Sequence, residues 1–389
     1  MKVLVIILLF VWSFQLNAQS NSKFDKDVAI EMMALNNSFS FIKIFGSDSS
    51  IIPNDYTRVY RSGIVGLDNQ YQIWSKDKVA IISFRGSTSK RASWLENLFS
   101  AMIPSTGKMK IKGYDEVNYK FAKDTAAHIH AGWSLGILSM VKDLTYHIKN
   151  LNQNGIKTII FTGHSQGGAL AHLARAYFEN LPNGFFKTKN QYITYAFASP
   201  MPGNKVFASE YNSRFASNLT SFNVVNPKDM VPLLPMTLYN GKLFDPEEVA
   251  DLLLNSNGSI AGMFAMRLVS KWFIKDPDAY YIQKAGHDIE EEVEGFIGEL
   301  DMPKYCRDQS YTPLENRMLI GPFEDVVKQL KRDSINIDSL KKIPFYSNNF
   351  DIQSGGSVQH KPFNYYLYLL KKYYPEQYAL TKERFRVID

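Results

Sequence analysis

Short apolar runs, separated by segments with helical spacing, dominate the first two thirds of this chain. The runs are rich in β-branched and aromatic residues, which predicts buried strands. They lie at 71–74, 79–84, 158–162, 192–197 and 219–225. Strands that alternate with helices from residue 79 to 235 predict an α/β fold, with a largely parallel sheet covered by helices on both faces.

The regular alternation stops after residue 235. We interpret 19–235 as the main part of the core, and 236–349 as a helical insertion that caps the carboxyl-end edge of the sheet. The last segment, 350–389, contains a Gly-rich turn followed by a helical pattern rich in Tyr and Leu. That pattern predicts a return of the chain to the core.

The N-terminus has the pattern of a signal peptide over residues 1–18. Lys2 supplies a positive charge, Val3–Phe14 is apolar, and Ala18 is a small residue suited to cleavage. The apolar run is short for a transmembrane helix, although a retained signal anchor is the alternative. We therefore expect export to the periplasm or the medium.

Composition and charge limit the range of possible functions. The chain has 389 residues and a net charge of +6, spread along the chain without the basic stripe that nucleic-acid binding needs. The single cysteine, Cys306, excludes an internal disulfide framework. No cluster shows metal-ligand spacing, so we expect neither a metal nor a cofactor. Oligomeric state stays open.

The segment 158–178 carries the clearest chemistry. A strand pattern is followed by Gly163-His164-Ser165-Gln166-Gly167, and then by an Ala- and Leu-rich helix pattern. G-x-S-x-G between a strand and a helix is typical of a nucleophile elbow. Ser165 is then the nucleophile, and the backbone N–H of Gln166 at the helix start is placed to stabilise an oxyanion.

A serine nucleophile needs a base and an acid that orients the base, and on this fold they follow in the order acid, then histidine. Asp229 comes directly after a predicted strand, between Pro227 and Pro232. Two histidines follow it, His287 and His360. His287 precedes a run of acidic residues that is typical of a solvated helix, whereas His360 follows a Gly-rich turn and precedes an apolar helix. We therefore predict His360 as the base.

These motifs resemble, in order, those of the class 3 (fungal-type) lipase family of α/β-hydrolases. The stretches that carry the resemblance are Phe84–Ser87, His130–Trp133, Gly163–Gly168, Ser199–Asn204 and Asn226–Pro235. The resemblance implies an α/β-hydrolase fold and hydrolysis of carboxylic esters. It also implies that Ser87 gives a backbone N–H and a hydroxyl to the oxyanion, beside the N–H of Gln166.

The resemblance further implies a lid after the oxyanion loop. Its apolar residues would be Trp94, Leu95, Leu98 and Phe99. A buried amphipathic helix is the alternative for this segment. Such a lid would make transient contact with a lipid interface.

Three positions depart from the usual pattern of the family. Ser93 stands where Asn is usual before the lid Trp, and Asn97 stands where Asp is frequent. Gln166 replaces the more common Leu. The resemblance therefore does not predict which side chains hold the oxyanion loop in place.

The sequence thus predicts an exported serine hydrolase that acts on acyl-lipid esters through Ser165, Asp229 and His360. A phospholipase A1 or a feruloyl-type carbohydrate esterase would use the same triad. A binding protein that keeps the fold without activity is the alternative outside the enzyme class.

Overall fold

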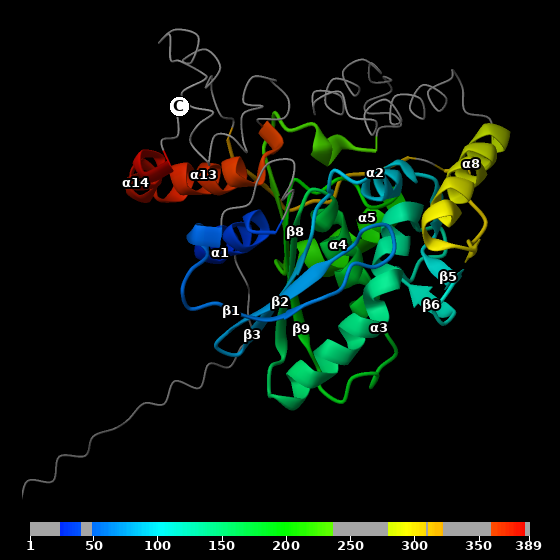
Figure 1. Ribbon diagram of the computed structural model, residues 1–389, viewed down its shortest axis with the longest axis horizontal. Helices are drawn as coiled ribbons and strands as arrows, with labels where there is room; N and C mark the ends of the chain where they lie inside the picture. Colours follow the sequence, from blue (N-terminus) through cyan, green and yellow to red (C-terminus); the bar gives the residue numbers. More distant parts are fainter. Residues whose placement is uncertain (1–23, 40–48, 236–278, 309, 322–358, 386–389) are drawn as a thin grey trace, which may run out of the picture.

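The computed structural model describes residues 24–39, 49–235, 279–308, 310–321 and 359–385 (Figure 1). Within them, seven strands form the main sheet in the order β1-β2-β3-β8-β9-β10-β12. Their bounds are β1 Thr57–Arg61, β2 Tyr71–Lys76, β3 Val79–Phe84, β8 Thr158–His164, β9 Gln191–Phe197, β10 Ser221–Val225 and β12 Arg317–Leu319. β1 to β3 pair antiparallel, and β3 to β12 pair parallel. The predicted fold class, an α/β-hydrolase sheet, is confirmed.

Helices cover both faces of this sheet (Figure 1). On one side lie α1 (Lys26–Asn37), α13 (Pro362–Tyr373) and α14 (Pro375–Phe385); on the other lie α3 (Ala131–Gln153), α4 (Gln166–Glu179) and α5 (Lys205–Tyr211). Strand residues alternate between the two layers, because successive side chains of a strand point to opposite faces. Ile159 and Phe161 of β8 pack with α3 and α4, while Ile160 packs with α1 and α13.

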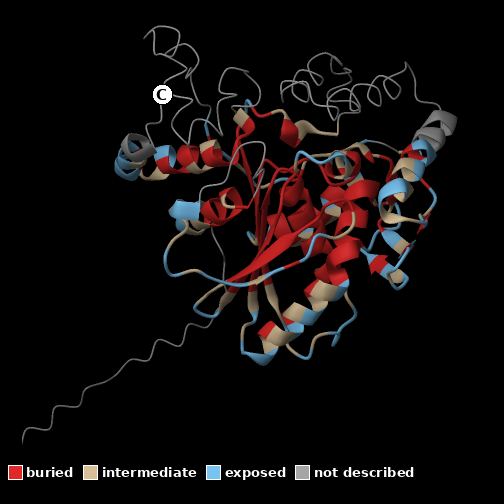
Figure 2. Ribbon diagram, in the orientation of Figure 1, coloured by how far each residue is buried: buried red, intermediate tan, exposed pale blue. Residues whose placement is uncertain are grey.

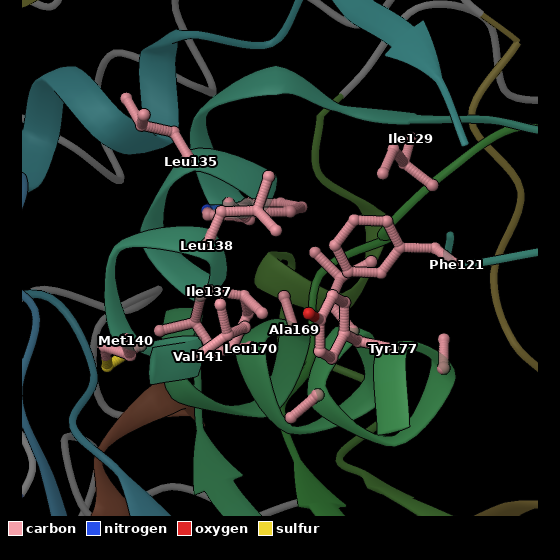
Figure 3. Packing of buried hydrophobic residues seen from close by; sticks show 14 of the residues in the cluster. Phe121, Ile129, Leu135, Ile137, Leu138, Met140, Val141, Ala169, Leu170 and Tyr177 are labelled. Atoms are coloured by element: carbon pink, nitrogen blue, oxygen red, sulfur yellow. The ribbon is translucent and has the colours of Figure 1, made fainter. Parts of the chain in front are cut away.

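The interior of the sheet and of the adjoining helix faces is buried (Figure 2). Buried apolar side chains of α3 and α4 belong to one cluster, which includes Leu138, Val141, Ala169, Leu170 and Tyr177 (Figure 3). This layer anchors the helix that begins directly after Ser165. The site is thus attached to the main buried core of the described residues.

Smaller elements flank the core. Their bounds are α2 Arg91–Leu98, β4 Met102–Pro104, β5 Thr106–Ile111, β6 Val117–Lys120, β7 His128–His130, α8 Ala279–Ile297 and β11 Leu300–Asp301, with short helical turns at Ser49–Ile51, Asn212–Ala216 and Val231–Leu233. β4 pairs with β7, and β5 pairs with both β6 and β11. α2 packs between α3 and α8.

One expectation about the domains needs correction. Residues 317–319 were predicted to be part of a helical insertion, but they form β12, which extends the main sheet beside β10. A strand of three residues carries no apolar run or alternation that could reveal it. Most of 236–349, the signal peptide and the start of 350–389 lie outside the described residues, so those predictions stay predictions. Among the described helices, none is both long and apolar enough to span a bilayer.

The contact between α2 and α3 depends on a glycine. A Cβ on Gly132 would lie 2.0 Å from the backbone oxygen of Glu96. Gly132→Ala should therefore destabilise the fold by about 1–3 kcal/mol, the usual cost of overpacking. Gly295→Ala in α8 is the matched control, since a Cβ there meets nothing within 4 Å. Alanine should raise stability there by about 0.5–1 kcal/mol. Urea unfolding of both variants tests this, and equal effects would contradict it.

Candidate active site

Ser165 occupies a strained turn between β8 and α4. Its φ and ψ are 59° and −130°, a region that non-glycine residues enter only when their surroundings hold them there. The surroundings do so through close backbone approach. A Cβ on Gly163 would lie 2.1 Å from Gly167 O, and one on Gly167 would lie 2.3 Å from Phe84 O. The predicted elbow is present, and α4 begins at the next residue, Gln166.

Three predicted residues meet at this turn. His360 Nδ1 lies 2.8 Å from Asp229 Oδ2, and His360 Nε2 lies 2.9 Å from Ser165 Oγ. A carboxylate only accepts hydrogen bonds, so Nδ1 carries the proton and Nε2 is left to accept from the Ser165 hydroxyl. All three side chains are buried. This arrangement can remove the hydroxyl proton from Ser165.

Asp229 is held on both carboxylate oxygens. Oδ1 accepts from the Val231 N–H at 3.0 Å, and Oδ2 accepts from the Tyr365 hydroxyl at 2.6 Å as well as from His360. Burial raises the pKa of Tyr365 well above its ordinary value, so the phenol stays a donor. Asn226 connects the segment that carries Asp229 to the segment that carries His360, since its side chain donates to the backbone oxygen of Gln359 at 3.0 Å.

A second histidine lies beside the base. The ring of His164 is 4.7 Å from that of His360 and packs edge-on against Tyr365. Burial holds the pKa of His164 well below its usual value, and the neighbouring His360 lowers it further. His164 is therefore neutral when His360 becomes protonated, so it adds no repulsion to that state.

The side chain of Ser87 lies in a hydrogen-bonded row with Gln166, the residue that follows Ser165. Ser87 Oγ donates to Gln166 Oε1 at 2.9 Å and accepts from Asn97 Nδ2 at 2.8 Å. The Gln166 N–H opens α4, so it has no acceptor within the helix. Ser87 and Gln166 are thus brought together, and their role as two oxyanion donors stays a prediction. However, the Ser87 hydroxyl proton is directed at Gln166.

Glu96 is a buried residue of this site that the sequence reasoning missed. It is 0 % exposed and accepts from Gln166 Nε2 at 2.7 Å and from Asn69 Nδ2. Burial raises the pKa of its carboxyl to about 8, although both hydrogen bonds oppose the shift. A lone Glu within an amphipathic helix pattern is normally solvated, so the pattern gave no signal of this role.

The four predicted lid residues do not share one exposed face. Leu95 and Phe99 are fully buried in the main core, because they lie on the side of α2 that packs on α3. Trp94 lies 7 residues after Ser87 in the sequence. Both Trp94 and Leu98 are half-buried. The other end of α2 is tied to α8, where Arg91 pairs with Glu292. A lid therefore stays a prediction for Trp94 and Leu98 alone.

His287 lies elsewhere. It is an exposed residue within α8, where its Nδ1 is 3.0 Å from Glu290 Oε2. Its predicted solvent exposure is confirmed. Throughout the described ranges, no three His, Cys, Asp or Glu side chains gather in a way that could hold a metal ion.

A sequence model of the family described as lipase (class 3) matches residues 81–239. Residues 81–239 belong to the class 3 lipase family. The match begins in β3 and includes the oxyanion loop, the elbow and Asp229, so it coincides with the ordered motifs quoted above. The protein is therefore a lipase-type carboxylic ester hydrolase.

Solved structures of fungal lipases are similar to this chain. Rhizomucor miehei triacylglyceride lipase shares 19% identity, with 55% of this chain and 76% of that chain covered and a TM-score of 0.39. Lipase II from Rhizopus niveus shares 20% identity, with 54% and 74% covered and a TM-score of 0.37. A lipase from Rhizopus microsporus var. chinensis shares 20% identity, with 54% and 69% covered and a TM-score of 0.37.

The raised pKa of Glu96 gives a prediction for stability. The folded protein binds a proton at Glu96 up to a pH of about 8, whereas the unfolded chain releases it near the ordinary value of 4.5. The free energy of unfolding should therefore fall as pH rises through this window. The side chain at position 96 cannot titrate in the Glu96→Gln variant. The Tm of the variant minus the Tm of the wild-type protein should therefore be larger at about pH 8 than at about pH 5. A Tm difference that is the same at both pH values would contradict this.

Proposed function

We propose that this class 3 lipase is an exported serine hydrolase that cleaves acyl-lipid esters through an acyl-enzyme. The observation that supports it most is the continuous row of hydrogen bonds from Asp229 through His360 to Ser165, at a strained turn. Nucleophile, base and orienting acid have the chain order and the contacts that this chemistry requires. Export is proposed from residues 1–18, which carry the signal-peptide pattern.

Each residue has a defined part in the proposed mechanism. Ser165 Oγ bonds to the ester carbonyl carbon while its proton passes to His360 Nε2, and the imidazolium is stabilised by Asp229. The carbonyl oxygen becomes an oxyanion that accepts from the Gln166 N–H and from Ser87. When the tetrahedral intermediate collapses, the ester C–O bond breaks and His360 protonates the leaving alcohol. Water, deprotonated by His360, then attacks the acyl-enzyme; the bond between the acyl carbon and Ser165 Oγ breaks, His360 returns the proton to Oγ, and the acid is released.

The choice of base is tested by alanine substitutions at both histidines. His360→Ala and Ser165→Ala should each lower kcat by several orders of magnitude, because triad members act as a unit. His287→Ala is the matched control and should leave kcat unchanged, since His287 is exposed on α8, where it lies beside Glu290 and Tyr305. Hydrolysis of a soluble p-nitrophenyl ester measures all three. An active Ser165→Ala enzyme would overturn the mechanism, and loss at His287 with retention at His360 would overturn the assignment of the base.

Substrate preference and the lid are tested together at a lipid interface. Trp94 and Leu98 are half-buried apolar residues directly after the oxyanion loop, so their exposure to lipid should increase the rate. Hydrolysis of tributyrin should rise sharply as its concentration passes the solubility limit, and Leu98→Ser should reduce the rise. Leu380→Ser, at an exposed position of α14, is the control and should change nothing. A wild-type rate without any rise would exclude the lid.

The same purified protein should be assayed on triolein, phosphatidylcholine and a feruloyl ester. We expect triolein to be preferred. Preference for phosphatidylcholine would indicate a phospholipase A1, and preference for the feruloyl ester would indicate a carbohydrate esterase. No turnover of any ester, with no labelling of Ser165 by a fluorophosphonate, would indicate an inactive binding protein.

A further inference from the structure

In the hydrogen-bonded row that contains Ser87 and Gln166, the residue at one end, Trp133, determines which group donates and which accepts at the next steps. An indole N–H can only donate, and Trp133 Nε1 donates to Asn97 Oδ1 at 3.0 Å. The amide of Asn97 must therefore present its Nδ2 to Ser87 Oγ, at 2.8 Å. Because Ser87 Oγ accepts there, its own proton goes to Gln166 Oε1, at 2.9 Å.

The row ends at Glu96. Since Gln166 Oε1 faces the hydroxyls of Ser87 and Ser93, its Nε2 faces Glu96 Oε1 at 2.7 Å. Glu96 also accepts from Asn69, and it is fully buried. Room for the carboxyl comes from α3, where a Cβ on Gly136 would lie 2.5 Å from Glu96 Oε1. An ionised Glu96 is thus the acceptor on which the whole row converges.

In this direction the Ser87 hydroxyl proton points away from the place of an oxyanion. The Ser87 proton can face the oxyanion when the side-chain amide of Gln166 flips, which exchanges the positions of Oε1 and Nε2. Nε2 then donates to Ser87 Oγ, and Oε1 faces Glu96. Glu96 must then donate a proton, which its carboxyl does only when protonated. In this arrangement the Asn69 amide can still donate to the second oxygen of Glu96, and the Ser87 hydroxyl, which has lost Gln166 Oε1 as its acceptor, is left to donate to the oxyanion.

We propose that Glu96 is a positioning residue of the ester hydrolase site: acting through the side-chain amide of Gln166, it determines whether the Ser87 hydroxyl proton faces the oxyanion. Glu96 does not touch the substrate, so it is not a catalytic residue. The inference rests on the proposed hydrolysis by Ser165. It also accounts for two of the departures from the family pattern, Asn97 and Gln166, because they are members of one row.

The charges around Glu96 agree with this role. Burial raises its pKa to about 8, and the nearby Asp68 raises it further. The charge of Asp68 is itself paired with Arg85 at 3.2 Å and with Lys90 at 2.6 Å. His130, at the start of α3, has its pKa lowered by burial to about 3, so it does not titrate in the same range. The carboxyl can therefore exchange its proton near neutral pH.

The experiment compares kcat and KM as functions of pH for the wild-type protein and two variants, with a soluble p-nitrophenyl ester. Wild-type kcat should fall at least about tenfold as pH rises through about 8, because one oxyanion donor contributes about 10²–10³ in rate. Glu96→Gln, whose amide can donate at any pH, should keep kcat within about twofold at neutral pH and lose this alkaline fall. Glu96→Leu should lower kcat at least about tenfold at all pH values, with KM little changed.

A double variant tests whether Glu96 acts through Gln166. If it does, Glu96→Leu/Gln166→Leu should lose no more kcat than the more affected single variant, since coupled positions are not additive. Glu31→Gln is the matched control, because Glu31 bonds Lys76 and Tyr56 on the α1 side of the sheet. It should leave the pH profile of kcat unchanged. Circular dichroism confirms that each variant is folded.

The outcomes separate this inference from the proposed function. A wild-type protein without esterase activity, and with no difference from Ser165→Ala, would overturn the proposed function. An active wild-type protein whose alkaline fall is unchanged in Glu96→Gln would overturn only the role of Glu96. Additive losses in the double variant would also overturn it, because Glu96 would then act independently of Gln166.

Discussion

The close approach of three backbone segments at the elbow is the constraint on which the site depends. β8, the start of α4 and the end of β3 meet where Gly163 and Gly167 leave no space for a side chain. That contact forces Ser165 into its positive φ, lifts its hydroxyl out of the sheet and turns the first N–H groups of α4 towards it. The strain at Ser165 is sustained by the apolar layer between α3 and α4, which fixes the helix from behind.

One buried polar network includes Ser165, and a second includes the next residue, Gln166. In the first, Tyr365 and His360 converge on Asp229. In the second, Ser87 and Gln166 converge on Glu96. Each network ends in a buried carboxyl group, and Asp229 accepts from three donors whereas Glu96 accepts from two. Desolvation favours the neutral form of a buried acid, and at Glu96 it outweighs both hydrogen bonds.

The sequence indicated the parts of the site that are local in the chain. Ser165 and Asp229 could be placed because each follows an apolar strand pattern within a short motif, and a histidine had to follow Asp229. Contacts between distant segments were beyond such reasoning. The bond between Glu96 and Gln166 joins residues 70 apart, and neither residue type indicates burial. β12 is too short to produce a pattern, and Leu95 is buried by a neighbour that periodicity cannot identify.

His360 lies 195 residues after Ser165 and 131 residues after Asp229, and the helix that follows it packs against α1 at the opposite end of the chain. Contacts of such sequence separation form late, because a long loop must close before they can stabilise anything. During synthesis from the N-terminus, Ser165 and Asp229 leave the ribosome well before His360. Under the proposed mechanism, a nascent chain that stops short of His360 contains the nucleophile without its base, so ester cleavage can begin only after His360 has been added.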